Sequence, residues 1–184
     1  MKTWTIFFNQ GMKKIFSIFF LFFLYNCEAK EQKSPRSPIT NLLPYHFILA
    51  SDLFEFELFE KAIEEYNKVL EIDPGYSPAL SGLGYSYLKL NKHDQAIKNW
   101  KKLLPLLKEG NQKAGIYLNL GLASFEKKKK ASSLFYTFQA LQLSTQHKSL
   151  RIQNNAKNNL VTFKNFFKLT DAEVIDIVKH FEKN

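Results

Sequence analysis

The chain has 184 residues, 45% of them hydrophobic and 18 of them Phe, which is enough for one domain with a substantial core and a short extra segment. The formal net charge is +9, but the basic residues are spread along the sequence, and this distribution argues against nucleic acid as the partner. A single cysteine excludes an internal disulfide and a thiolate metal site.

Residues 1–26 have the features of an export signal. Lys13 and Lys14 precede the apolar run 15–25, which is too short for a membrane span of ~20 residues and has the proportions of a secretory hydrophobic region. Residues 1–11 would be an unusually long preface to such a signal, so Met12 is an alternative start. Removal of residues 1–26 leaves 23 basic and 17 acidic residues, a net charge of +6.

The end of the apolar run carries the only cysteine of the sequence. The segment Leu24-Tyr25-Asn26-Cys27 resembles the bacterial lipobox, in which leucine precedes the modified cysteine by three residues. The resemblance implies cleavage before Cys27 and acylation of its thiol, for example with palmitate. The mature protein would then be a membrane-anchored lipoprotein of the cell envelope, on its periplasmic or surface side. Tyr25 and Asn26 depart from the usual small residues, and an ordinary signal peptide or uncleaved anchor is the alternative.

Residues 27–41 follow as a predicted flexible tether, because they are charged, contain two Ser-Pro steps and lack apolar periodicity. From residue 42 the apolar residues follow a helical period as far as 147. The clearest part is 77–110, where Ser77 and Pro78 predict an N-cap and a first helical turn. A tight antiparallel helix pair needs small residues where its backbones approach and large ones where the crossing leaves volume. The small residues are Gly84 and Ala96, and the large ones are Leu80, Leu83, Tyr87 and Trp100.

This spacing resembles the tetratricopeptide (TPR) repeat, a helix–turn–helix unit of about 34 residues with the pattern W-x2-L-G-x2-Y, a later A-x3-F and a closing Pro. The pattern recurs at 43–76 and, after a short insertion, at 114–147, so residues 42–147 would hold three repeats. The defining residues of the two flanking repeats are Ala62, Tyr66, Pro74, Tyr117, Leu120, Gly121 and Ala140. The third repeat departs at Ser124 and Ser133. The resemblance implies an all-α, TPR-like α-solenoid.

Residues 148–184 are predicted to form C-terminal capping helices at 149–168 and 171–183. A repeat array needs its last apolar face covered, and the first of these helices offers apolar residues for this purpose, namely Leu160, Val161, Phe163, Phe166 and Phe167. The second helix begins with a predicted capping box of Thr170 and Glu173.

Nothing in the sequence indicates catalysis, a cofactor or a metal. The four histidines lack a metal-ligand spacing such as H-E-x-x-H, and nucleophile, phosphate-loop and dinucleotide motifs are absent from the sequence. We therefore expect a protein that is not an enzyme. The lysine run 127–130 is interpreted as a solvated turn, with contact to anionic headgroups as the alternative.

In TPR proteins the first helix of each pair lines a concave groove in which partner peptides lie. Carried over by register, the resemblance implies a groove of Phe47, Phe54, Tyr85, Leu88, Lys89, Leu118, Asn119, Leu122 and Phe125. Only Lys89 and Asn119 resemble the clamp that other TPR proteins use for carboxylates. Because the face is mostly apolar and aromatic, either a hydrophobic peptide or helix of a partner docks there, or the helix 171–183 fills it.

Two functions remain open at this point. The first is a lipid-anchored, non-catalytic scaffold for protein–protein interaction in the bacterial cell envelope, with an unidentified protein or peptide partner. The second is a structural or assembly subunit of an envelope complex whose groove is occupied by residues 171–183. Repeat folds serve many roles, so the fold alone does not choose between them.

Overall fold

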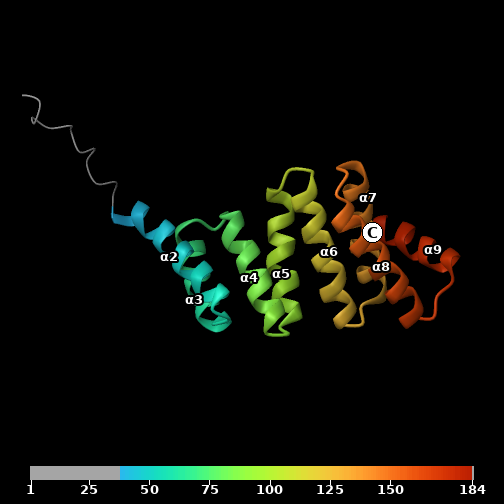
Figure 1. Cartoon of the computed structure of the whole chain (residues 1–184), viewed down its shortest axis with the longest axis horizontal. Coiled ribbons are helices and arrows are strands. Elements are labelled where there is room, and N and C mark those ends of the chain that lie inside the picture. Colours follow the sequence, from blue (N-terminus) through green and yellow to red (C-terminus); the bar gives the residue numbers. More distant parts are fainter. Residues whose placement is uncertain (1–37, 184) are drawn as a thin grey trace, which may run out of the picture. The chain divides into compact units, whose positions relative to one another are not determined.

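The computed structural model describes residues 38–183, and all regular secondary structure in this part of the chain is helical (Figure 1). The predicted all-α class is therefore confirmed for these residues. The elements are α2 (Pro38–Glu55), α3 (Phe59–Ile72), α4 (Ser77–Lys89), α5 (His93–Leu103), the 3-10 helix η1 (Leu104–Leu106), α6 (Asn111–Glu126), α7 (Lys130–Gln146), α8 (Leu150–Phe166) and α9 (Asp171–Glu182). The predicted signal peptide and Cys27 lie outside the described residues. Because α2 begins at Pro38, the end of the predicted tether 27–41 is helical.

The helices follow one another in chain order within one compact unit, residues 39–184 (Figure 1). Short turns join α2 to α3, α4 to α5 and α6 to α7, and these helices pack as pairs. Each second helix also packs on the first helix of the next pair, so that α3 contacts α4, α5 contacts α6 and α7 contacts α8. Every pair thus shares its core with the next one, as in a solenoid.

The contact between α4 and α5 is built as the residue sizes predict. Ala96 and Trp100 are fully buried on α5. A Cβ atom placed on Gly84 would lie 2.1 Å from Nε1 of Trp100, so the indole occupies the space that the glycine leaves open. Leu80 packs in the same cluster, whereas Leu83 faces the core of the first pair. The two leucines therefore join α4 to both of its neighbours.

The third pair meets through small and polar side chains instead. A Cβ atom on Gly121 would lie 2.2 Å from Oγ1 of Thr137, which brings α6 and α7 close together. Ser124, Ser133 and Thr137 are buried beside it. The Ser133 hydroxyl donates to the Lys130 carbonyl at 2.8 Å, but the Thr137 hydroxyl has no hydrogen-bond partner. The departures of the third repeat from the family pattern thus create a polar seam of Gly121, Ser124, Ser133 and Thr137.

Five helix ends close with a residue in the left-handed conformation that is not glycine. These residues are Glu57, Asn91, Lys128, Lys148 and Lys168, with φ between 54° and 60°. After α6, the Lys128 N–H donates to the Phe125 carbonyl at 2.7 Å and the Lys129 N–H donates to the Ser124 carbonyl at 2.9 Å. This pair of bonds is the Schellman motif, which satisfies two of the last helical carbonyls.

Two N-cap residues were predicted, Ser77 and Thr170, and the structure confirms only the second. Ser77 is not an N-cap, because the Tyr76 carbonyl already accepts from the N–H groups of Ala79 and Leu80, so that Ser77 is the first helical residue. The capping box at Thr170 is confirmed. Its hydroxyl accepts from the Glu173 N–H at 3.3 Å, and its N–H donates to the Glu173 carboxylate at 2.7 Å.

Candidate partner-binding surface

The predicted groove residues lie on α2, α4 and α6, the first helices of the three pairs, but they differ in accessibility. Tyr85 and Lys89 are exposed. The other members are partly buried: Phe47, Phe54, Leu88, Leu118, Asn119, Leu122 and Phe125. The accessible part of the predicted surface is therefore centred on α4.

Tyr85 is held in place from two sides. Its ring meets that of Trp100 edge to face, with centroids 5.5 Å apart. Its hydroxyl accepts a hydrogen bond of 2.9 Å from Nδ2 of Asn119 on α6. The hydroxyl proton remains available for donation to a ligand, and Lys89 lies one helical turn further along α4. The surface thus presents an oriented phenol, an amide and an ammonium group on two adjacent helices.

The aromatic residues of α2 pack within the first pair. The ring of Phe47 lies 5.4 Å from that of Tyr76 and 6.1 Å from that of Tyr66, and Phe54 lies 5.4 Å from Phe59. Both phenylalanines belong to the core cluster that joins α2, α3 and α4. Leu88 and Leu118 likewise pack on neighbouring core clusters. The predicted face is therefore less apolar at its surface than its sequence indicates.

Phe125 is covered by α8. Its ring stacks on that of Phe163 at 4.1 Å and meets the rings of Phe166 and Phe167 at 4.9 and 5.8 Å. The TPR register places Phe125 on the groove side of α6. However, α8, the first helix of the following pair, packs on Phe125. We therefore exclude Phe125 from the surface offered to a partner.

The C-terminal helix does not fill the predicted groove. α9 packs on α7, where Val178 is buried beside Leu134 and the ring of Phe181 lies 4.7 Å from that of Phe135. Among the predicted groove residues, the cluster that α9 completes includes only the covered Phe125. The alternative in which residues 171–183 occupy the groove is therefore wrong.

An ion-pair cluster joins α2 to α3. The Glu65 carboxylate accepts from Nδ1 of His46 at 2.5 Å and from Nζ of Lys68 at 2.6 Å. Burial raises the pKa of Glu65, but the hydrogen bonds from Lys68 and His46 outweigh it, and the pKa lies below its ordinary value of 4.5. The carboxylate therefore stays ionised at neutral pH.

Two side chains of the lysine run 127–130 form ion pairs with another helix of the fold. Nζ of Lys127 lies 2.7 Å and Nζ of Lys129 3.5 Å from the carboxylate of Asp94 on α5. The hydrogen bond from Lys127 lowers the pKa of the Asp94 carboxyl group. These contacts agree with the interpretation of the run as an inter-helix turn.

Among residues 38–183, no helix combines the length and the apolar character that crossing a bilayer requires. The same residues contain no group of three or more His, Cys, Asp or Glu side chains placed to hold a metal ion.

Two sequence models of the tetratricopeptide repeat match the chain, one at residues 44–76 and one at residues 65–98. Residues 44–98 therefore match the TPR repeat. Its fold is similar to the crystal structure of the Sgt2 TPR domain from Aspergillus fumigatus, with a TM-score of 0.55 and 17% sequence identity, over 76% of this chain and 85% of that one. The predicted TPR-like α-solenoid is thereby confirmed.

The chain is also similar to the outer dynein arm-docking complex subunit 4 of Danio rerio, to which it is 26% identical over 117 residues. The match covers 60% of this chain and 24% of the relative, so the chain spans about a quarter of that protein's length. TPR domains bind protein or peptide partners, and the repeat is typically a non-catalytic interaction scaffold. Of the residues predicted to line the groove, Tyr85 and Lys89 are exposed, and Asn119 and Leu122 are partly exposed beside them on α6.

Proposed function

We propose that this chain is a non-catalytic scaffold, anchored to the membrane by a lipid on Cys27, that captures a protein or peptide segment on the surface formed by α4 and α6. The observation that carries the proposal is the orientation of Tyr85, which is exposed yet fixed by Trp100 beneath it and by Asn119 beside it. A tyrosine held in this way loses little conformational entropy on binding, and such residues often dominate interface energies.

The groups around Tyr85 indicate the chemistry of the partner segment. Lys89 supplies a cation, Asn119 supplies an amide, and Leu122 supplies a partly exposed apolar side chain on the neighbouring helix. A segment with a carboxylate next to an apolar side chain matches this arrangement. Because these groups lie on only two helices, α4 and α6, we expect a short linear segment as ligand, in the manner of the apolar anchor residues used in groove recognition.

The surface is tested by photo-crosslinking in intact cells. A benzophenone amino acid in place of Tyr85 should form adducts with the partner, whereas the same amino acid in place of the exposed Lys98 on α5 is the matched control. One recurrent adduct partner would support an assembly subunit, and several partners would support a scaffold. Equal adducts at both positions, or none at residue 85, would show that binding occurs elsewhere.

The anchor is proposed from the sequence of residues 12–27. Cleavage before Cys27 and acylation there would fix the chain to the cell envelope, with the residues that follow as a spacer, and several acyl chains are needed for stable attachment. Mass spectrometry of the native protein should find an acylated N-terminal Cys27, and Cys27→Ser should move the protein out of the membrane fraction. An intact start at Met1 or Met12 would contradict the proposal.

A further inference from the structure

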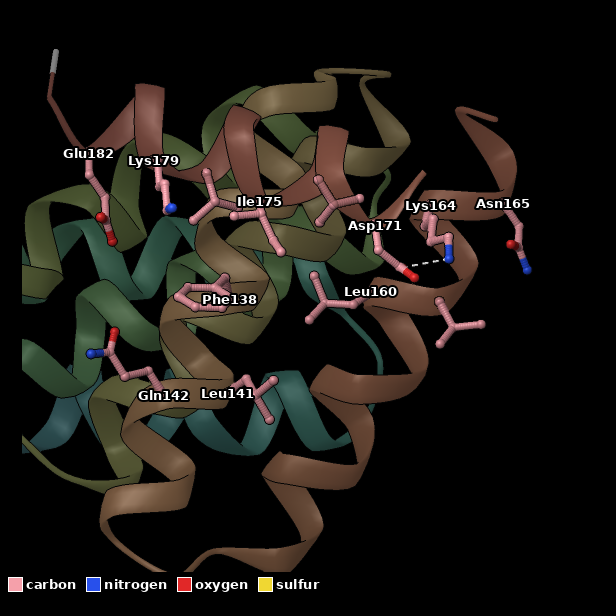
Figure 2. A pocket seen from close by; sticks show the side chains of 13 residues that line it. Phe138, Leu141, Gln142, Leu160, Lys164, Asn165, Asp171, Ile175, Lys179 and Glu182 are labelled. Atoms are coloured by element: carbon pink, nitrogen blue, oxygen red, sulfur yellow. Dashed lines mark hydrogen bonds and ion pairs between the residues drawn. The ribbon is translucent and has the colours of Figure 1, made fainter. Parts of the chain in front are cut away.

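An apolar groove of about 660 Å³ lies between α7, α8 and α9 (Figure 2). Phe138 and Leu141 of α7 lie opposite Ile175 of α9 in this view, and Val161 of α8 also lines the groove. We name it the terminal groove. The exposed fractions of Val161 and Ile175 are 59% and 54%, so that apolar side chains of both α8 and α9 face solvent at the groove.

The terminal groove occupies a defined place in the repeat pattern. α3, α5 and α7 are each covered by the first helix of the next pair. α9 is the second helix of the last described pair, and no further helix covers it within residues 38–183. Repeat arrays close such an end with a helix that has a polar outer face. A groove in this place therefore fits a single amphipathic helix.

We propose that the occupant is α9 of a second copy of this chain, paired antiparallel to the first around a two-fold axis at Ile175. The argument is the order of charges along the side of α9 that lines the groove. Asp171, Ile175 and Lys179 follow one another at four-residue steps, which are about 6 Å each in a helix. Antiparallel pairing centred on Ile175 brings Asp171 of one copy opposite Lys179 of the other, and the symmetry makes this contact twice.

Both charged groups can make these contacts without loss of existing ones. Asp171 already accepts from Nζ of Lys164 at 2.6 Å, but its side chain is 85% exposed, and a carboxylate has acceptor sites for a second donor. Lys179 is exposed at the rim. Parallel pairing would place Asp171 opposite Asp171 and Lys179 opposite Lys179. An apolar partner helix would leave both Asp171 and Lys179 without an opposite charge. The charge order therefore favours the antiparallel second copy.

Sedimentation velocity tests the proposal with the chain that begins at Glu28, which contains the whole compact unit 39–184. We expect the mass to rise from that of a monomer to that of a dimer with concentration. Ile175→Glu should abolish the rise. The matched control is Leu150→Glu, because Leu150 is 71% exposed on α8 and does not line the groove, and this variant should dimerise like the unmodified chain.

A charge exchange gives the sharper result. Lys179→Glu places acidic groups opposite each other and should remain monomeric, and Asp171→Lys should do so with basic groups. An equimolar mixture should form a heterodimer, because both inter-copy contacts are then between opposite charges. A monomer at every concentration, or a dimer that tolerates Ile175→Glu, would overturn the proposal. So would a monomer that binds an apolar dye and loses the dye in Ile175→Glu, because the groove would then serve another occupant.

Discussion

Replacement of Gly84 by alanine inserts one methyl group against the ring at the centre of the array. The new Cβ would lie 2.1, 2.4 and 2.5 Å from Nε1, Cε2 and Cδ1 of Trp100, whereas non-bonded carbon atoms prefer about 3.5–4.0 Å. Trp100 is fully buried among core residues, so the ring cannot retreat without displacing them. Overpacking of this kind typically costs about 1–3 kcal/mol. Alanine gains about 1 kcal/mol over glycine inside a helix.

Each of the three ring atoms lies at least 1 Å closer than the preferred distance, which places the clash near the upper end of that range. We therefore expect Gly84→Ala to lower the free energy of unfolding by about 1–2 kcal/mol after the helix propensity is included. The matched control is Gly115→Ala on α6, where an added Cβ would meet no heavy atom within 4 Å. The same methyl group should raise stability there by about 0.5–1 kcal/mol.

The assay is urea unfolding of the chain that begins at Glu28. This chain keeps Trp100 and lacks Trp4, so its tryptophan fluorescence reports on the substituted site while circular dichroism reports on all helices. We expect the midpoint to fall for Gly84→Ala and to rise for Gly115→Ala. If both midpoints rose equally, the indole would not lie against Gly84, and the packing described for α4 and α5 would be refuted.

Three further substitutions test other features. Lys128→Gly should raise the melting temperature by about 2–4 °C, because the left-handed conformation costs a non-glycine residue about 1–2 kcal/mol, and a decrease would show that the lysine side chain contributes more than the strain. Thr137→Val should raise the urea midpoint, with a gain of about 1 kcal/mol from the loss of an unpaired buried hydroxyl, and a lower midpoint would mean that the hydroxyl has a partner. Glu65 has a lower pKa in the folded chain than its ordinary 4.5, so its contribution is complete above 4.5 and disappears as the pH falls through the folded value. Glu65→Gln should remove this part of the acid sensitivity, and an unchanged pH profile would count against the ion-pair cluster.

The helix pairing of the middle repeat could be predicted because it depends on residue size over a short stretch. Gly84, Ala96 and Trp100 lie within one helix–turn–helix unit, and their spacing determines which of them meet. The same reasoning could have found Gly82, whose added Cβ would lie 2.3 Å from the ring of Tyr66 on α3. The available signal was a second glycine, two residues before Gly84, combined with a large aromatic residue at the equivalent of Trp100 in the first repeat.

The candidate surface was less predictable, because an apolar residue shows that a position is covered but not what covers it. Leu122 and Phe125 lie one turn apart on α6, and only the path of α8 decides that Phe125 is enclosed by Phe163, Phe166 and Phe167. The terminal groove is similar. Val161 was predicted to pack on the third repeat, but its side chain is 59% exposed and lines the terminal groove. The angle between two helices depends on how their side chains pack together. The sequence of each helix alone does not determine this packing.

The hydrogen bond between Tyr85 and Asn119 joins two adjacent helix pairs on the side proposed for the partner. A bond of this kind between accessible groups is worth about 0.5–1.5 kcal/mol, which corresponds to a factor of about 2–12 in an equilibrium constant. The Asn119 amide has two N–H donors, so a ligand carboxylate can accept the second one while the bond to Tyr85 is kept. A partner that contacts both Tyr85 and Asn119 would then link the same two helix pairs a second time, and occupancy would stiffen the junction between the second and third pairs.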